Sequence, residues 1–455
     1  MTTDAEAVVS HMSLSYRRYV LGALTLVYTL NFLDRGLMIL LLQSVKDDLH
    51  LSDTQLGFLT GIAYAIFYAV LGLPIARWAD RANRVTLTAI AIGLWGLTVA
   101  ACLLVVNFTQ LVLARIAAAV GESGCMPPTY SLVGDYFPRA TERTRAIAVY
   151  MLAGPLATLM SFIAGGALNA RFGWRITFAL LGAPAFLAAV LIKVTVTEPR
   201  ATGSHAQGWV PRLPGVSDIL KVLWERRSTR HLSIAITLLF TMGFGLAPWY
   251  AAFMIRSHGM STPELGLWLG LIFGATGALG ILIGGYATSR WFVGDERGQM
   301  RLSATMIAGL VPCYVLFLLV PGRMAALISL VPLMIVFNFF CAPAFALMQR
   351  LVIDEMRATT LAVVMLLVNL IGMGVGPQVV GILSDVFALK LGADSLRYSM
   401  LMVSFIALWA AYHFWQVGTT VSEDLAAVNR GISGTGLFGC AGSSAPVVRP
   451  CRPHS

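Results

Sequence analysis

Apolar stretches of about twenty residues recur along the whole length of this 455-residue chain, separated by short polar loops. A helix of that length crosses the roughly 30 Å hydrocarbon core of a bilayer. Only 12% of the residues are charged, whereas soluble globular proteins carry about 25%. We therefore predict an all-α integral membrane protein, with twelve transmembrane helices between about residues 18 and 417.

The longest interruption lies between the sixth and seventh predicted spans and divides the chain into two halves. Arg, Ala, Val, Met and Leu recur in register in residues 143–152 and 357–366, after the fourth and the tenth span. This repeat predicts parallel halves about an axis along the membrane normal. The predicted regions are a disordered N-terminal tail (1–17), an N-terminal six-helix bundle (18–196), a cytoplasmic linker (197–230), a C-terminal six-helix bundle (231–417) and a cytoplasmic, mostly disordered tail (418–455).

Basic residues are concentrated in the N-terminus, the even-numbered loops and the central loop, and are sparse in the odd-numbered loops. Because loops rich in Lys and Arg stay on the cytoplasmic side, this bias places both termini in the cytoplasm. The same bias accounts for the net charge of +10 without a nucleic-acid partner.

Within the central loop, apolar residues recur at helical spacing, with charged residues opposite them. The apolar positions are Val216, Ile219, Leu220, Leu223 and Trp224. Two arrangements fit this pattern: a helix lying at the membrane surface, and a linker helix packed on the ends of the bundles.

The first span carries ionisable residues at the depth of the hydrocarbon core, where each charge costs about 2.5–3.5 kcal/mol. Asn31, Asp34 and Arg35 stand at i, i+3 and i+4, so they share one face of a helix. In the fourth span, Arg115 and Glu122 are seven residues apart and also share a face. We expect these two faces to line a polar cavity between the helices.

The predicted spans of the second half hold few charges. Among their polar and aromatic residues, Trp249 and Tyr250 fit the wall of an apolar ligand site, and an interfacial aromatic belt explains them equally well. A neutral wall opposite the charged faces suits an amphiphilic or aromatic substrate with one charged end. Arg35 or Arg115 would then pair with an anionic head group.

The loop between the second and third spans resembles a signature of the major facilitator superfamily. It reads Ala76-Arg-Trp-Ala-Asp80-Arg81-Ala-Asn83-Arg84, with alanine and asparagine at the positions where the superfamily usually has glycine. The corresponding loop of the second half lacks the acid. The resemblance implies two six-helix bundles in the major facilitator fold.

Within that superfamily the chain resembles the spinster family over nearly the whole length between its tails. The residues that carry the resemblance are Asn31-x-x-Asp34-Arg35, Leu51-Ser-Asp53-Thr-Gln55-Leu-Gly57, Gly121-Glu122-Ser-Gly124 with Pro127-Pro128, Asp135-Tyr-Phe-Pro138, Gly173-Trp174-Arg175 and Gly372-x-Gly374-x-Gly376-Pro377-x-x-x-Gly381. The resemblance implies a transporter, in this case in a bacterial inner membrane. Eukaryotic members export lysolipids and sphingoid phosphates, and bacterial members are more diverse in substrate.

The resemblance also implies that Asp34, Arg35 and Glu122 meet at a central cavity and couple transport to protons. Protonation of Asp34 or Glu122 would release Arg35 from its ion pair and change which gate can open. The alternative is a static buried network that only sets the helix register. We expect a conformational latch at the cytoplasmic end; the alternative is positive-inside charge alone. The expected substrate-binding residues are Tyr28, Asn31, Arg35, Arg115, Glu122, Trp249, Tyr250 and Asn369, and the expected latch residues are Asp80, Arg81, Arg84, Asp135 and Arg143.

These observations favour a proton-coupled secondary transporter of a small amphiphilic or organic-anion substrate, with lysolipid-like molecules among the candidates, working by rocker-switch alternating access. The alternatives are a non-transporting receptor or sensor that keeps the fold, and a proton-independent facilitator. A Gly-x-x-x-x-Gly-Lys-Ser/Thr loop and a His-Glu-x-x-His motif are absent, which disfavours an ATP-driven pump and an intramembrane enzyme. The six cysteines have no metal or disulfide spacing. We expect no cofactor besides the proton gradient, no metal, membrane lipids as neighbours, and a monomer.

Overall fold

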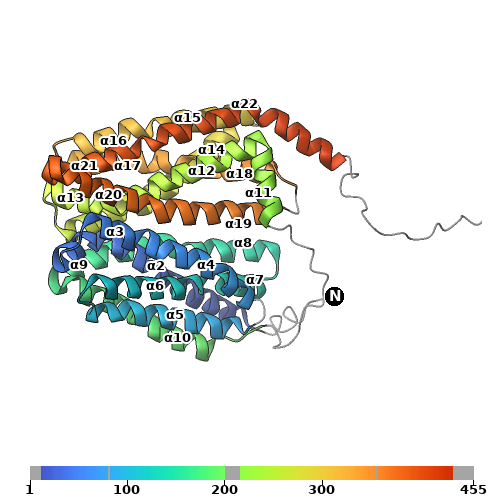
Figure 1. Ribbon diagram of the computed structural model, residues 1–455. Coiled ribbons are helices and arrows are strands. Elements are labelled where there is room, and N and C mark those ends of the chain that lie inside the picture. Colours follow the sequence, from blue (N-terminus) through green and yellow to red (C-terminus); the bar gives the residue numbers. More distant parts are fainter. Residues whose placement is uncertain (1–11, 80–81, 200–215, 354–355, 434–455) are drawn as a thin grey trace, which may run out of the picture.

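Two bundles of long helices lie side by side in the computed structural model of the chain, which describes residues 12–79, 82–199, 216–353 and 356–433 (Figure 1). The described residues contain helices and no strands. The first bundle consists of α2 (Leu14–Leu49), α3 (Asp53–Thr60), α4 (Ile62–Ala79), α5 (Arg84–Ala100), η1 (Ala101–Leu104), α6 (Phe108–Ser123), α7 (Met126–Tyr136), α8 (Ala140–Met151), α9 (Ala153–Gly182) and α10 (Pro184–Thr195).

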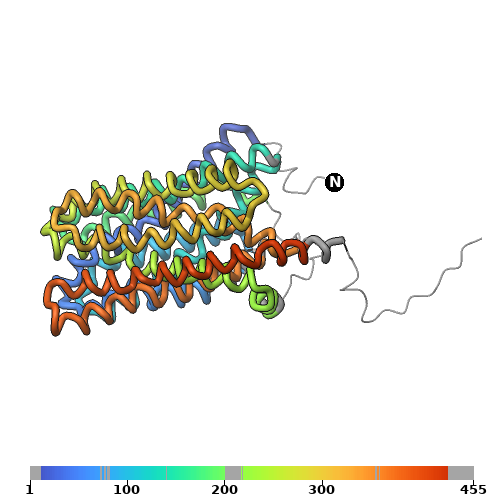
Figure 2. The backbone as a smooth tube through the Cα atoms, turned by 90° about the horizontal axis from the view of Figure 1, so that it is seen from above, coloured from blue at the N-terminus to red at the C-terminus, as the bar shows by residue number. Residues whose placement is uncertain are grey.

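The second bundle begins after a separate linker helix, α11 (Val216–Glu225), and packs its helices in the same antiparallel manner (Figures 1 and 2). It consists of α12 (Arg227–Leu246), α13 (Trp249–His258), α14 (Thr262–Trp291), α15 (Glu296–Ala308), α16 (Leu310–Leu319), α17 (Arg323–Phe339), α18 (Cys341–Arg350), α19 (Arg357–Leu367), η3 (Val368–Met373), α20 (Gly374–Leu391), η4 (Gly392–Asp394), α21 (Ser395–Ser404) and α22 (Ile406–Ser433).

Nine stretches of the described residues are helical, apolar and long enough to cross a membrane. Two of these stretches, residues 141–195 and 359–428, fold back once and therefore hold two passes each. A further pass, α6 with α7, is broken near Gly124 and is not among the nine. Together they make the twelve passes of the predicted fold.

Gly173 interrupts the helix α9 in the first bundle. Its φ of 76° lies in the left-handed region, where residues with a Cβ atom are strained. The fifth pass ends there and the sixth begins at Trp174. The label α9 therefore covers two helices that meet at Gly173 and belong to different passes.

The start of α2 and the end of α22 lie at the same end of the bundles (Figure 1). We call the end that carries the start of α2, the helix α11 and the end of α22 the termini end, and the opposite end, with α3 and the end of α13, the far end. Helix α2 begins at Leu14, where Ser13 caps it, so part of the predicted N-terminal tail is helical. Helix α22 continues to Ser433, well beyond the predicted last span.

The linker helix combines the two arrangements that its sequence allowed. Ile219 and Leu223 are buried, because α11 packs on the start of α12 and on α19. Leu220 and Trp224 of the same apolar face remain 44% and 65% exposed. The helix is therefore packed on the bundle while part of its apolar face is uncovered.

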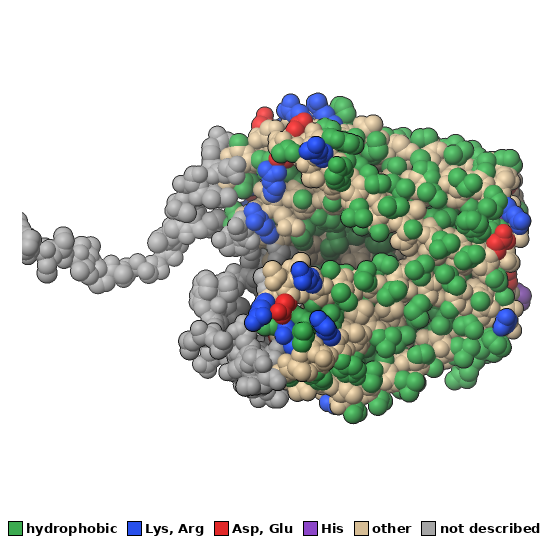
Figure 3. Space-filling view, turned by 180° about the vertical axis from the view of Figure 1, so that it is seen from behind, with side chains coloured by type: hydrophobic (Ala, Val, Ile, Leu, Met, Phe, Trp, Pro, Cys, Tyr) green, Lys and Arg blue, Asp and Glu red, His purple; other side chains and the backbone are tan. Residues whose placement is uncertain are grey.

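The outer surface has the pattern of a membrane protein. Figure 3 shows hydrophobic side chains across the middle of one face, with Lys, Arg, Asp and Glu gathered at the two ends. Such a surface is stable where lipid covers the apolar belt and water covers the ends.

Candidate functional site

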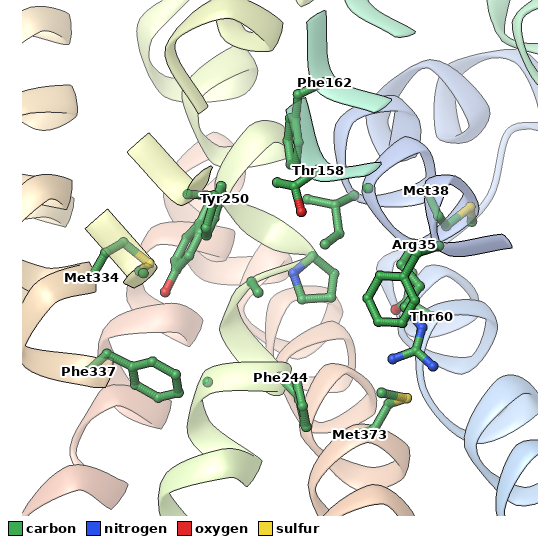
Figure 4. A pocket seen from close by; sticks show the side chains of 18 of the residues that line it. Arg35, Met38, Thr60, Thr158, Phe162, Phe244, Tyr250, Met334, Phe337 and Met373 are labelled. Atoms are coloured by element: carbon green, nitrogen blue, oxygen red, sulfur yellow. The ribbon is translucent and has the colours of Figure 1, made fainter. Parts of the chain in front are cut away.

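A cavity of about 470 Å³ lies between the two bundles, near the middle of the helices (Figure 4). The first half contributes Arg35 and Arg115, and the second half contributes aromatic and apolar side chains. The residues that line it are Phe32, Arg35, Gly36, Met38, Ile39, Thr60, Tyr64, Arg115, Thr158, Phe162, Gly243, Phe244, Ala247, Pro248, Tyr250, Phe273, Gly277, Tyr314, Met334, Phe337, Asn338 and Met373.

Four charged side chains meet at the first-half wall of this cavity, and they form two ion pairs between helices. Arg35 of α2 pairs with Glu122 of α6, with Nε and Nη2 each 2.7 Å from Oε1. Arg115 of α6 pairs with Asp34 of α2 through Nη1 and Oδ2. Asp34 therefore does not pair with its neighbour Arg35, because adjacent residues on a helix do not face each other.

The two bases face the cavity and the two acids lie behind them. Arg35 and Arg115 line the cavity, while Asp34 and Glu122 are 1% and 2% exposed and are not among its lining residues. Protonation of either acid would thus leave a guanidinium at the cavity wall without its counterion. The arrangement links the charge of a buried acid to the charge that a ligand meets.

Aromatic rings hold the guanidinium of Arg35 in place. Its Cζ lies 4.5 Å from the ring centroid of Phe32, 5.4 Å from that of Tyr64 and 5.1 Å from that of Tyr68. The Tyr64 hydroxyl also donates to Oε2 of Glu122. Tyr64 therefore contacts both members of this ion pair, and it is a site residue that the sequence analysis did not single out.

The opposite wall is neutral and largely aromatic. Figure 4 shows Tyr250, Met334 and Phe337 across the cavity from Arg35. The hydroxyl groups of Tyr250 and Tyr314 lie 2.6 Å apart and satisfy each other. Ring stacking continues from Tyr250 to Phe273, with centroids 6.0 Å apart. Such a wall can cover an apolar ligand body without desolvating a charge.

Among the predicted substrate-binding residues, Arg35, Arg115 and Tyr250 line the cavity and the others do not. Tyr28 stacks on Tyr150, with centroids 4.9 Å apart, outside the cavity wall. Asn369 donates from Nδ2 to the carbonyl of Met365, 2.9 Å away on its own helix. The sequence predicted that these residues lie in membrane spans. Only the packing of the helices shows which face of each helix lines the cavity.

Asn31 and Trp249 are also buried behind the wall. The Nδ2 of Asn31 and the Nε1 of Trp249 have no hydrogen-bond partner among the described residues. In the second half it is Asn338, rather than Asn369, that lines the cavity. Asn338 donates from Nδ2 to the carbonyl of Met334 at 2.8 Å.

The far end is closed by an ion pair that joins the halves. Asp53 at the start of α3 accepts from Arg256 of α13 at 2.7 and 2.8 Å, and from Ser384 of α20 at 2.6 Å. Asp385 accepts from the backbone amides of Asp53 and Thr54 at 3.0 and 2.7 Å, at the N-terminus of α3. Asp53 and Thr54 belong to the spinster-like Leu-Ser-Asp-Thr-Gln-Leu-Gly motif, whereas their partners come from the second half.

Glycines let the two halves touch at the same end. A Cβ atom on Gly381 of α20 would lie 2.2 Å from the carbonyl oxygen of Asp53. A Cβ atom on Gly166 of α9 would lie 2.5 Å from the carbonyl oxygen of Thr262. These glycines serve close packing between helices, as expected for small residues in membrane bundles.

At the termini end, the polar contacts among the described residues stay within one half. Arg84 pairs with Asp135 at 2.7 Å and with Glu198, which the sequence analysis did not single out. Arg143 donates to the carbonyls of Phe137 and Pro138 at 3.2 and 3.3 Å. The predicted latch residues Asp80 and Arg81 lie outside the described residues.

The two bundles are less closely joined toward the termini end. Figure 3 shows a hollow between the upper and lower bundles at that end, where the bundles separate. With the far end joined by Asp53 and Arg256, the structure has one closed gate and one open gate.

Comparison with known proteins identifies similar sequences over most of the chain. Residues 24–377 match the family model of the Major Facilitator Superfamily. An MFS-type efflux pump of Mycolicibacterium smegmatis is 34% identical over 413 residues, covering 89% of this chain and 93% of that protein. Protein spinster homolog 1 of Homo sapiens is 24% identical over 387 residues, covering 80% of this chain and 72% of that protein.

A solved structure has the same fold. A bacterial homolog of the human lysosomal transporter Spinster, in an inward-facing and unoccupied conformation, superposes with a TM-score of 0.81 at 29% identity. The match covers 91% of this chain and 99% of that chain. The occupied, inward-facing form of that homolog gives a TM-score of 0.79 at 28% identity.

Proposed function

Because this chain belongs to the Major Facilitator Superfamily and is spinster-like within it, we propose that it is a proton-coupled secondary transporter of a small organic anion with an apolar body. One observation carries the proposal: two buried acids each hold a base at the wall of a central cavity. The working cycle is rocker-switch alternating access. The membrane is the bacterial inner membrane, with both termini in the cytoplasm.

Coupling follows from competition for Arg35. A substrate anion that pairs with this guanidinium displaces the Glu122 carboxylate, which is 2% exposed and cannot be hydrated in place. Breaking a buried ion pair by removing one partner costs about 3–5 kcal/mol. A proton on Glu122 removes that cost, so proton and anion binding favour each other. The Asp34–Arg115 pair offers the same linkage on the adjacent helix face.

Alternating access then needs the far-end gate to break. The Asp53–Arg256 pair and the capping of α3 by Asp385 hold the halves together in the present conformation. We propose that rocking separates them while the termini end closes through the latch around Arg84, Asp135, Arg143 and the Asp80-Arg81 loop. During this movement the ion pairs of buried Arg84 with Asp135 and Glu198 hold the helix ends of the first half together.

The substrate class follows from the cavity walls. Arg35 and Arg115 attract one anionic group, while Phe162, Phe273 and Phe337 can cover an apolar body. A cavity of about 470 Å³ accommodates a small amphiphile such as a lysolipid-like molecule or an aromatic acid. One relative is named an efflux pump, and another, of Bacillus subtilis, is named a hexuronate transporter, which indicates an organic anion as the substrate of that second protein.

Reconstituted proteoliposomes test the proposal directly. A panel of lysolipids and aromatic acids is first screened by thermal shift, because a ligand that binds the folded state stabilises it. Each stabilising ligand is then assayed for flux with and without an imposed pH gradient. Flux that follows the gradient supports proton coupling. Binding without flux would overturn the proposal in favour of a receptor, and flux that ignores the gradient would leave a facilitator.

A further inference from the structure

A second groove of about 320 Å³ lies outside the central cavity, on the lipid-facing surface of the second half near the termini end. Its walls come from three elements: the linker helix with Leu223 and Trp224, α12 with Ile234 and Leu238, and the eleventh pass with Leu367 and Ile371. Trp224 and Ile371 are 65% and 41% exposed, so the groove opens outward. Apart from Arg230, Ser233 and Thr237, the residues that line it are apolar.

One polar group inside the groove has no partner. Ser233 lines the groove and is 92% buried, and its hydroxyl makes no hydrogen bond within the described part of the chain. One turn earlier, Thr229 donates to the carbonyls of Val222, Leu223 and Arg226. An unsatisfied hydroxyl at membrane depth is costly. The Ser233 hydroxyl is therefore available to donate to an oxygen of a bound molecule.

A cation stands at the rim of the same groove. Arg230 lines it, and its Cζ lies 5.7 Å from the Trp224 ring. Its Nη1 donates to the Trp224 carbonyl at a long 3.4 Å. Among the described residues no carboxylate lies within ion-pair distance of Arg230, while Arg227 beside it is exposed. The rim thus carries positive charge above an apolar floor.

We propose that this groove binds an anionic glycerophospholipid of the leaflet at the termini end. One acyl chain lies between the linker helix and the eleventh pass, the phosphate pairs with Arg230, and the Ser233 hydroxyl donates to an ester or phosphate oxygen. The order of the groups matches the ligand, because a phospholipid also has a charged head, ester oxygens below it and apolar chains beyond them. In the groove, Arg230 stands at the rim, the hydroxyl groups of Ser233 and Thr237 lie on α12, and the remaining lining residues are apolar. The lipid completes the partly uncovered apolar face of α11.

The groove adjoins a segment that also reaches the central cavity. The π-helix η3 runs from Val368 to Met373. Ile371 forms part of the groove wall, and Met373 lines the central cavity. Because π-helical turns inside α-helices frequently mark functional sites, we expect lipid in the groove to influence the eleventh pass. That expectation rests on the proposed transport function, whereas the lipid site itself does not.

The test uses the delipidated full-length chain in detergent and measures thermal unfolding against added dioleoyl phosphatidylglycerol or dioleoyl phosphatidylcholine. Three variants change the groove: Arg230→Gln, Ser233→Ala and Thr237→Phe, which fills the groove from a half-buried position of α12 that lines it, without changing charge. Arg297→Gln is the matched control, because Arg297 is an exposed arginine at the termini end away from the groove. Unfolding without lipid shows whether each variant is folded.

We expect phosphatidylglycerol to stabilise the parent chain at lower concentration than phosphatidylcholine. Arg230→Gln should weaken this effect roughly tenfold, as for the loss of one charge-assisted hydrogen bond. Thr237→Phe should weaken it similarly, Ser233→Ala a few-fold, and Arg297→Gln less than about twofold. Equal stabilisation by both lipids would overturn the site. So would an equal loss in Arg297→Gln, an undiminished effect in Thr237→Phe, or full stabilisation by sn-glycerol-1-phosphate alone. Flux is not measured, so a failure of the transport proposal leaves this test unaffected.

Discussion

The two halves of the molecule share one fold but divide the chemistry unequally. Among the described residues, the buried acids, arginines and lysines all lie in the first half: Asp34, Asp53, Arg84, Arg115 and Glu122. The second half contributes an uncharged wall of aromatic and apolar side chains to the cavity. A charge at membrane depth is costly unless it is paired. Because both pairs at the cavity have their two members in the first half, a change in their protonation leaves no charge unpaired in the second half. The first half thus carries the groups that can titrate, and the second half supplies the surface that fits the ligand.

The two ends differ in a corresponding way. At the far end the halves are joined by Asp53, Arg256 and Asp385. At the termini end the polar contacts of the described residues remain within each half. One set of contacts must therefore break and another must form when the halves rock. The following predictions test this division, from the largest expected effect to the smallest.

Neutralising the buried acids should have the largest effect. Glu122→Gln and Asp34→Asn keep the shape of each side chain but remove its titration, so flux driven by a pH gradient should fall at least about a hundredfold. The pH dependence of ligand affinity should flatten, since anion binding in the parent chain should tighten as pH falls. Flux in proteoliposomes and ligand titration between pH 5 and 8 measure both effects.

Glu423→Gln is the matched control, because Glu423 is exposed on α22 and lies far from the cavity. It should leave flux and its pH dependence unchanged. An unchanged pH dependence in both buried variants would mean that the quartet of charges is a static network.

Breaking the far-end ion pair should shift the conformational equilibrium. Asp53→Asn leaves Arg256 without its carboxylate, and removing one partner of a buried pair costs about 3–5 kcal/mol. The closed far end should therefore open in a large fraction of molecules. Spin labels at Arg171→Cys and Lys390→Cys, in a background without native cysteines, should report a longer distance across that end.

Asp48→Asn provides the comparison for this measurement. Asp48 lies at the same end and pairs with Arg175 at 2.6 Å, but both residues belong to the first half. Its loss should leave the label distance unchanged. If the two variants behave alike, the Asp53–Arg256 pair does not hold the gate.

Adding one methyl group at the far-end contact should have a smaller effect of the same sign. In Gly381→Ala the new Cβ would lie 2.2 Å from the carbonyl oxygen of Asp53, so α3 and α20 must separate. Overpacking of this kind costs about 1–3 kcal/mol. The same label pair should report partial opening, whereas Gly134→Ala, whose Cβ meets nothing within 4 Å, should not.

Changes in the neutral wall should have the smallest effect and should leave coupling intact. Tyr250→Phe removes one hydroxyl of the Tyr250–Tyr314 pair, and a hydrogen bond contributes about 0.5–1.5 kcal/mol. Ligand affinity should change by less than about tenfold, with the pH dependence of flux unchanged. A shifted pH profile in this variant would show that the second half takes part in titration, against the division described above.

Much of the fold could be predicted because membrane insertion imposes strong local rules. The length of each apolar stretch predicted the passes. The predicted boundaries of the first and last spans were less accurate, since α2 begins before and α22 ends after the apolar stretch that hydropathy detects. The sequence could not decide between the two arrangements of the linker helix, because part of its apolar face is buried against the bundle and part of the same face is exposed.

The sequence by itself determined that charges would be buried in the first and fourth passes, because acids and bases at membrane depth are recognisable one residue at a time. Only the tertiary structure decided their partners. Asp34 pairs with Arg115 and Arg35 with Glu122, because the crossing of α2 and α6 sets those distances. The tertiary structure likewise decided that Tyr64 contacts Glu122, that Asn338 lines the cavity and that Asp53 pairs with Arg256. Spacing along the chain does not predict these contacts. Partner choice depends on helix rotation and packing, which hydropathy and short motifs do not record.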